Sequence, residues 1–175
     1  MSSPKRSAGR ARTADRHELY ELAVQHPPGE VEFVSTTFAT IRERKARTLR
    51  EDFCGTANTS CEWVRRDPEH LAIGVDLDGE VQDWGRRHRL SRLSPEQRER
   101  IRLVQDDVSH LRSGEEPDIV LAMNFSYYLL MTREALGAYF RAVRASLAGD
   151  GIFFLDAYGG YEAPMVLTEE RDCGG

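Results

Sequence analysis

LREDFCGTA at residues 49–57 and AIGVD at residues 72–76 are the two stretches that decide how this chain folds. In the first, the acidic residue Glu51 leads into a tight Cys-Gly turn at Gly55, and a segment with a helical pattern follows. In the second, an apolar run of strand length ends in a carboxylate, Asp76. A strand, a glycine turn, a helix and a second strand in this order form a unit that can hold a nucleoside at the carboxyl ends of its strands.

The same alternation continues along the chain. Apolar runs of strand length recur at residues 101–104, 119–122 and 152–155. Amphipathic helical patterns follow the capping residues Asp78 and Thr132. Strands that alternate with helices at these distances predict an α/β fold with a doubly wound, mainly parallel sheet and helices on both faces. The leading strand, residues 48–52, is unusually polar for a strand buried in such a sheet.

The chain divides into three segments by pattern. Residues 1–14 are basic and rich in Ser, Ala and Gly, which predicts a disordered tail. Residues 15–47 predict a helical cap of two helices, separated at Pro27 and Pro28 because proline lacks the amide proton that a helix interior requires. Residues 48–175 hold the alternating strands and helices of the α/β domain.

Composition limits the classes of function. The 175 residues suffice for one domain with a sizeable core, and the net charge of −5 gives no global attraction to nucleic acid. No apolar run approaches the roughly 18 residues that a membrane span needs, so we expect no membrane partner and a cytoplasmic location. The three cysteines are odd in number and lack C-x-x-C spacing, so we expect no disulfide framework and no metal site.

The two opening stretches resemble the class I S-adenosylmethionine-dependent methyltransferases. In that family the first motif reads acid-x-Gly-x-Gly-x-Gly after strand one, and strand two ends in an acid that binds the ribose. Glu51 takes the acidic place and Gly55 the middle glycine, whereas Phe53 and Ala57 stand where the other glycines are expected. The resemblance covers about residues 49–160. It implies a Rossmann-like methyltransferase fold, S-adenosyl-L-methionine as cofactor and methyl transfer to a small-molecule acceptor.

The resemblance also assigns roles around the cofactor. Asp76 lies 21 residues after Gly55, close to the spacing used for ribose recognition in dinucleotide folds, so we expect its carboxylate to accept the ribose hydroxyls. Asp107 is expected to accept from the adenine amino group, and Asp106 is the competing candidate. The predicted cofactor-binding residues are Glu51, Phe53, Cys54, Gly55, Asp76, Leu77, Asp107, Val108 and Asn124.

No catalytic residue is assigned, because methyl transfer chiefly needs the reactants to be positioned and water excluded. If a general base exists, Asp156, Tyr158 and residues 124–127 follow predicted strands and are the candidates. Residues 124–127, NFSY, are faintly similar to the Asn-Pro-Pro-Tyr signature of amino-group methyltransferases, but both prolines are absent.

Complete members of this family carry two more strands, which residues 156–175 are too short to supply. We therefore expect a truncated chain, or a fifth strand whose exposed edge pairs with a second copy. Two other functions remain open: a cofactor-binding or interaction module without catalysis, and an NAD(P)-binding oxidoreductase. The oxidoreductase reading requires three glycines in the pattern G-x-G-x-x-G, and residues 54–57 contain one.

Overall fold

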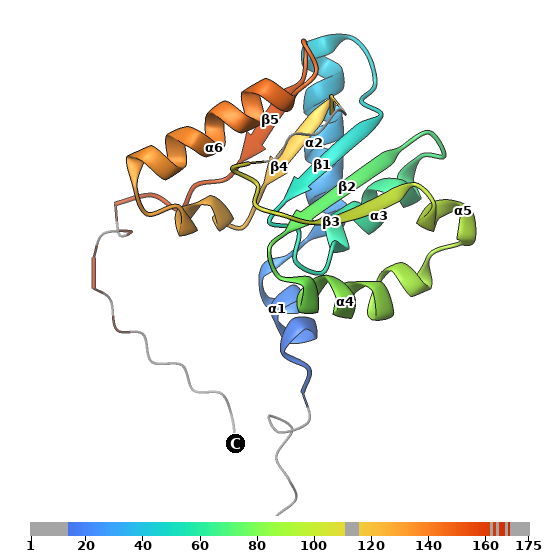
Figure 1. Cartoon of the computed structure of the whole chain (residues 1–175), viewed down its shortest axis with the longest axis horizontal. Helices are drawn as coiled ribbons and strands as arrows, with labels where there is room; N and C mark the ends of the chain where they lie inside the picture. Colours follow the sequence, from blue (N-terminus) through green and yellow to red (C-terminus); the bar gives the residue numbers. More distant parts are fainter. Residues whose placement is uncertain (1–13, 111–115, 162, 164, 167, 169–175) are drawn as a thin grey trace, which may run out of the picture.

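The computed structural model describes residues 14–110, 116–161, 163, 165, 166 and 168, so nearly all of the predicted tail at 1–14 lies outside the described residues. One sheet of five strands runs in the order β3-β2-β1-β4-β5, and every neighbouring pair is parallel (Figure 1). This confirms the predicted doubly wound sheet. The strands are β1 (Thr48–Asp52), β2 (Leu71–Asp76), β3 (Ile101–Gln105), β4 (Ile119–Ala122) and β5 (Ile152–Leu155).

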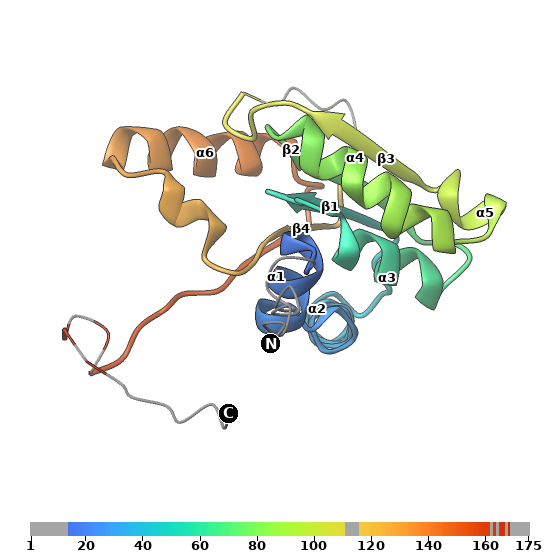
Figure 2. The same cartoon turned by 90° about the horizontal axis from the view of Figure 1, so that it is seen from below.

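Helices cover both faces of the sheet. They are α1 (Arg16–Val24), α2 (Pro27–Arg42), α3 (Asn58–Arg66), α4 (Gly79–His88), α5 (Pro95–Arg98) and α6 (Arg133–Ser146), with 3-10 turns η2 (Leu90–Arg92) and η3 (Ser126–Leu129). Figure 2 shows α2 and α3 on one side of the sheet and α6 on the other. None of the helices in the described part of the chain is long and apolar enough to cross a membrane.

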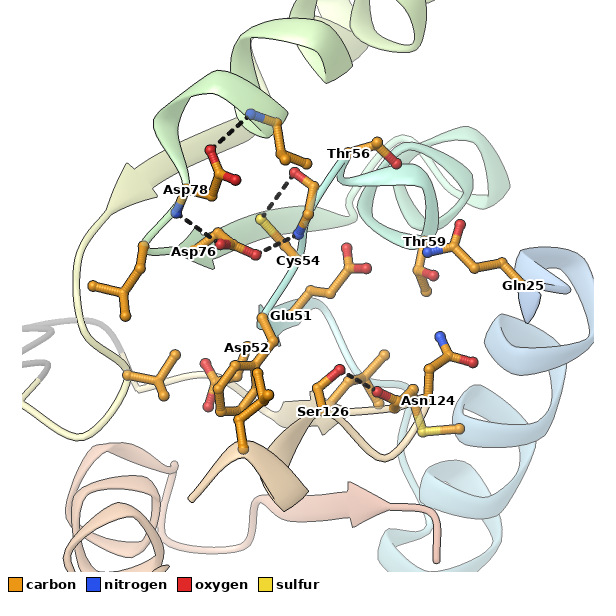
Figure 3. A pocket seen from close by; sticks show the side chains of 18 of the residues that line it. Gln25, Glu51, Asp52, Cys54, Thr56, Thr59, Asp76, Asp78, Asn124 and Ser126 are labelled. Atoms are coloured by element: carbon orange, nitrogen blue, oxygen red, sulfur yellow. Dashed lines mark hydrogen bonds between the residues drawn. The ribbon is translucent and has the colours of Figure 1, made fainter. Parts of the chain in front are cut away.

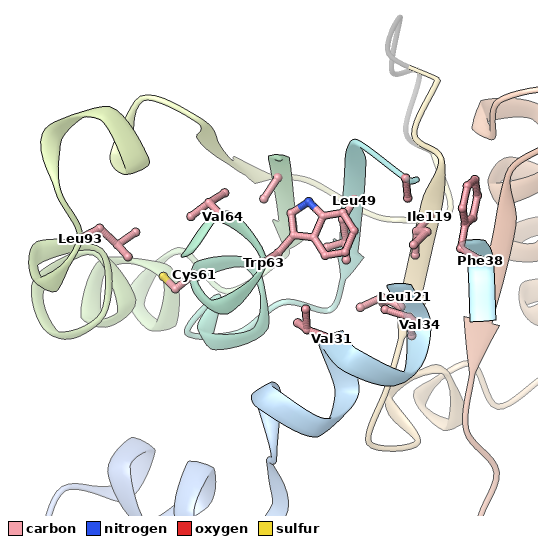
Figure 4. Packing of buried hydrophobic residues seen from close by; sticks show 12 residues of the cluster. Val31, Val34, Phe38, Leu49, Cys61, Trp63, Val64, Leu93, Ile119 and Leu121 are labelled. Atoms are coloured by element: carbon pink, nitrogen blue, oxygen red, sulfur yellow. The ribbon is translucent and has the colours of Figure 1, made fainter. Parts of the chain in front are cut away.

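Each face has its own hydrophobic core. On the first face Trp63 of α3 and Phe38 of α2 pack with Leu49 of β1 (Figure 4). On the second face Tyr139 of α6 packs with Val120 of β4. The two cores are separate because successive residues of a strand point to opposite sides of the sheet.

The polar strand β1 can be buried because Arg50 and Asp52 pair with each other and hydrogen-bond to α6. The Nε and Nη2 of Arg50 donate to the Asp52 carboxylate at 2.7 and 3.1 Å. The Nη1 of Arg50 donates to the Ser146 hydroxyl at 2.7 Å, and the Tyr139 hydroxyl donates to Asp52 at 2.9 Å. A buried charge is tolerated when it is paired and fully hydrogen-bonded, so this network lets a polar strand occupy the centre of the sheet.

The large apolar residues of the first cap helix do not pack into the core. Leu19, Tyr20 and Leu22 are exposed, and the buried residue of α1 is Glu21. Glu21 forms an ion pair with Arg89, which follows α4. Periodicity gives the spacing of apolar residues along a helix, and it does not say which side of the helix faces the core.

Polar contacts hold α1 over the carboxyl ends of the strands (Figure 1). Glu21 accepts a hydrogen bond from the Thr56 hydroxyl in the turn after β1. Asp15, which caps α1, accepts from the Trp84 indole nitrogen of α4 at 2.8 Å. The helix is therefore tied to both the β1–α3 turn and α4, the two elements that border the cavity described next.

Candidate functional site

A cavity of about 530 Å³ lies at the carboxyl ends of β1 to β4 (Figure 3). Its floor comes from the turns that follow these strands, and part of its wall comes from His17 and Tyr20 of α1. All nine residues predicted to bind a cofactor line it: Glu51, Phe53, Cys54, Gly55, Asp76, Leu77, Asp107, Val108 and Asn124. The sequence therefore located the residues that share one cavity.

The turn after β1 keeps the left-handed backbone that a glycine-rich motif would supply. The φ angles of Phe53, Gly55 and Ala57 are 57°, 51° and 57°. These are the three positions at which the methyltransferase motif carries glycine. A left-handed conformation costs a residue with a side chain roughly 1–2 kcal/mol, so the surrounding contacts must hold the turn in this shape. The Phe53 ring makes an edge contact with Tyr139, with ring centroids 5.5 Å apart.

Asp76 joins the turn after β1 to the end of β2. Its Oδ2 accepts from the Gly55 amide at 2.7 Å, and its Oδ1 accepts from the Asp78 amide at 2.9 Å. Each carboxylate oxygen has a second lone pair, so the side chain retains acceptor capacity toward the cavity. Figure 3 shows Asp76 between Asp78 and the Cys54 turn, as these bonds require.

Asp106 and Asp107 both line the cavity after β3, so the structure brings together both candidates for the adenine contact. The Asp107 carboxylate accepts from the Ser109 amide at 2.8 Å and contacts the His110 ring at 3.1 Å. The Ser109 amide is the main cause of the lowered pKa of Asp107. Asp106 accepts from the Asp107 amide at 2.8 Å.

Glu51 is a buried acid of the cavity, as is its neighbour Asp52. The Oε2 of Glu51 accepts from the Ser60 amide at 2.8 Å and from the Ser60 hydroxyl at 2.5 Å. Burial raises the pKa of Glu51 to about 7, against the opposing effect of the Ser60 hydrogen bonds. Figure 3 shows the side chain reaching from β1 into the cavity. A positive charge placed beside Glu51 would favour its ionised form.

The cavity is acidic. Its carboxylates are Glu51, Asp52, Asp76, Asp78, Asp106 and Asp107, and no Lys or Arg is among the described residues that line it. The described residues also contain no group of three or more His, Cys, Asp or Glu side chains placed to hold a metal ion. The lining therefore favours a neutral or positively charged ligand over an anion.

Sequence reasoning missed the wall opposite the strand ends. Gln25 and Thr59 line the cavity, and neither was singled out from the sequence. Gln25 is placed by the Asn58 side chain, whose Nδ2 donates to its Oε1 at 3.2 Å. That bond joins residues 33 positions apart, so no local pattern could have identified Gln25.

Asp156 and Tyr158, two of the three candidates for a general base, make contacts elsewhere. Both oxygens of Asp156 accept backbone amides, from Asn124 at 3.0 Å and from Phe125 at 2.9 Å. The backbone oxygen of Tyr158 accepts from the Tyr128 hydroxyl at 3.1 Å. Neither Asp156 nor Tyr158 is among the residues that line the cavity, whereas Asn124 and Ser126 of the third candidate, residues 124–127, do line it.

Solved structures with the same fold are methyltransferases. The chain is similar to an amino pentose methyltransferase from Micromonospora echinaspora solved with bound S-adenosylmethionine, with a TM-score of 0.68 and 21% identity over 91% of this chain and 61% of that one. It is similar to a sugar N-methyltransferase from Streptoalloteichus, with a TM-score of 0.68 and 20% identity over 97% of this chain and 64% of that one. For DesVI of Streptomyces venezuelae the TM-score is 0.69, with 21% identity over 85% of this chain and 60% of that one.

The likeness lies in the fold rather than in the sequence. No protein-family model matches the chain, and no curated protein sequence matches it. The chain spans 61%, 64% and 60% of the lengths of the three solved proteins. Over that span its fold matches theirs with TM-scores of 0.68, 0.68 and 0.69. This protein therefore has the fold of the class I S-adenosylmethionine-dependent methyltransferases.

Proposed function

We propose that this chain binds S-adenosyl-L-methionine in the cavity and serves methyl transfer to a small-molecule acceptor. One observation carries the proposal: carboxylates at the ends of β2 and β3 and the left-handed turn after β1 meet in a single cavity. An adenosyl group joined to an amino acid needs this combination, because its ribose diol and adenine amino group are donors and its amino acid must approach the backbone closely.

Different residues of the cavity bind different parts of the ligand. Asp76 accepts the ribose hydroxyls while the Gly55 and Asp78 amides hold its carboxylate in place. Asp107, or its neighbour Asp106, accepts from the adenine amino group, and the backbone of Val108 lies beside the ring. Glu51 faces the ammonium group of the methionine part of the ligand. The first amides of α3 favour the carboxylate of that methionine part.

This chain contributes to the reaction by positioning the reactants and by excluding water from them. The cofactor supplies a methyl group on a positive sulfonium, which becomes neutral as the methyl group leaves. Phe53 places an aromatic ring at the floor of the cavity, and α1 closes one side through His17 and Tyr20, which excludes water from the reacting atoms. No step in this proposal requires a dedicated base.

An amine is the acceptor class that we favour: a neutral amine would accept the methyl group and displace the thioether, and the ammonium formed would release its proton to water. The acidic lining disfavours anionic acceptors, whereas it stabilises a positive charge near the mouth. The solved neighbours include sugar and glycopeptide N-methyltransferases, which is consistent with this choice.

The charge of the cavity disfavours an NAD(P)-binding oxidoreductase. A dinucleotide brings a doubly charged pyrophosphate, which needs glycines at close approach and positive charge nearby. Here Phe53 and Ala57 occupy two glycine positions, and carboxylates dominate the described lining. Electrostatic repulsion would oppose binding of the pyrophosphate.

The test is calorimetric titration of the chain with S-adenosylhomocysteine, NAD and NADP. We expect saturable binding of S-adenosylhomocysteine alone. Binding of either dinucleotide in its place would contradict the proposal. A donor-consumption assay with a panel of amines then tests turnover, and cofactor binding without turnover would identify the chain as a cofactor-binding module instead.

A further inference from the structure

The segment that leaves β4 holds two successive residues in the left-handed conformation. Asn124 and Phe125 both have φ of 57°, in the left-handed region that asparagine tolerates but that a bulky residue such as Phe125 avoids. Asn124 lines the cavity, and Ser126, Leu129 and Leu130 continue the same wall. Such a conformation persists only where neighbouring groups enforce it.

Asp156 supplies the enforcing contacts. Its Oδ2 accepts from the Asn124 amide at 3.0 Å, and its Oδ1 accepts from the Phe125 amide at 2.9 Å. Two successive amides that converge on one anion form a known kind of anion-binding concavity, and here the anion is a side chain of the same protein. The contact follows from the sheet: β4 and β5 are parallel neighbours with Ala122 opposite Leu155, so Asp156 emerges beside the segment that it binds.

A second contact joins the same two segments. The Tyr128 hydroxyl of η3 donates to the backbone oxygen of Tyr158 at 3.1 Å. The Phe125 ring contacts the Tyr158 ring with centroids 5.9 Å apart. Residues 156–158 after β5 therefore contact the segment after β4 both at its start, residues 124 and 125, and at Tyr128.

We propose that Asp156 is a positioning residue that holds Asn124 and Phe125 in the left-handed conformation and thereby places the cavity wall that begins at Asn124. The consequence for ligand binding rests on the proposed function, because it requires S-adenosylmethionine and its acceptor to use this wall. Asp156 acts through the backbone amides of its partners, because it does not itself line the cavity.

The first test is amide hydrogen exchange of the wild-type chain and of the variants Asp156→Ala and Asp156→Asn. We expect Asp156→Ala to speed exchange of the Asn124 and Phe125 amides at least tenfold while the amides of β1 and β2 keep their rates. Asp156→Asn keeps the shape but only one acceptor oxygen, so it should give an intermediate result. It also serves as the test if Asp156→Ala does not fold.

The second test is titration of the same proteins with S-adenosylhomocysteine, below the unfolding midpoint of each. We expect Asp156→Ala to weaken binding at least tenfold and Asp156→Asn less. The control is Asp150→Ala, which removes an exposed carboxylate that pairs with Arg44 and should leave affinity within twofold.

The outcomes separate the two proposals. Unchanged exchange at residues 124 and 125 overturns the positioning role, and so does faster exchange with unchanged affinity. Failure of the wild-type chain to bind S-adenosylhomocysteine overturns the proposed function, and the exchange rates alone then decide whether Asp156 holds the segment.

Discussion

Asp76 is positioned before any ligand arrives, because the Gly55 and Asp78 amides fix its carboxylate. We expect Asp76→Ala to weaken S-adenosylhomocysteine binding at least about tenfold, since each charge-assisted hydrogen bond is worth roughly 1.5–3 kcal/mol. Calorimetry measures the effect. The control is Asp83→Ala, an exposed carboxylate of α4 that pairs with Arg86. Equal affinities of the wild type and Asp76→Ala would remove Asp76 from the site.

Glu51 makes the site sensitive to pH. Its pKa is about 7 in the folded chain, above the ordinary value of 4.5, because the side chain is buried. The folded state therefore binds an extra proton, so the contribution of Glu51 to stability is complete below about pH 4.5 and is lost as the pH rises through about 7.

Ligand binding should have the opposite pH dependence. An ammonium group beside Glu51 favours the ionised form, so we expect affinity for S-adenosylhomocysteine to rise between about pH 6 and 8, by less than about tenfold per pH unit. Titration across this range measures it. Glu51→Gln cannot ionise and should flatten the profile, and a wild-type profile that is already flat would argue against contact between Glu51 and the ammonium group.

At the scale of elements, the cavity depends on how closely α4 approaches the turn after β1. A Cβ at Gly85 would lie 2.3 Å from the backbone oxygen of Thr56. Backbone cannot move aside as the end of a flexible side chain can, so Gly85 permits the close packing of α4 on the turn that carries Gly55.

We expect Gly85→Ala to lower the free energy of unfolding by about 1–3 kcal/mol, the usual cost of overpacking. Gly137→Ala is the matched control, because Gly137 also lies inside a helix but its Cβ would meet only the end of the Arg141 side chain. It should raise the free energy of unfolding by roughly 0.5–1 kcal/mol through helix propensity. Denaturant unfolding measures the free energy of unfolding of both variants. Equal changes in the two variants would show that α4 can shift away from the turn and would contradict the prediction.

At the scale of the whole molecule, the cavity joins distant parts of the chain. Its lining runs from His17 of α1 to Leu130 after η3. A ligand bound there contacts α1, the strand-end turns and η3 together. Ligand binding should therefore stabilise the described fold as a unit rather than one local segment.

We expect S-adenosylhomocysteine at about 100 times its dissociation constant to stabilise the chain by about 2.7 kcal/mol. For a protein of this size that corresponds to a rise in unfolding temperature of roughly 5–10 °C. Thermal unfolding with and without ligand measures the rise, and NADP at the same concentration is the control. An equal rise with NADP would indicate unspecific binding.

The outer edge of β5 is the place where two copies of the chain could pair. In the described sheet β5 pairs with β4 alone, and Leu155 is exposed. Pairing of this edge with a second copy stays a prediction. Light scattering over a range of concentrations tests it, and a monomer at high concentration would speak against it.

The sequence alone determined the alternation of strands and helices and the place of the ligand site. The apolar run at residues 119–122 predicts a buried strand because it is short and follows Pro117, and parallel strands bring their carboxyl ends to one edge. Asp76 and Asp107 could therefore be assigned to one cavity from their positions at strand ends. These inferences use local pattern and the geometry of the sheet.

Only the tertiary structure decided the roles of residues whose partners are distant. Arg50 and Asp52 are buried because Ser146 and Tyr139 of α6 satisfy them. Glu21, rather than the apolar residues of α1, faces inward because Arg89 lies opposite, 68 positions along the chain. Asp156 binds amides 32 and 31 positions away. The sequence does not reveal such pairs, because a buried polar side chain is stabilised by a partner that folding alone brings near.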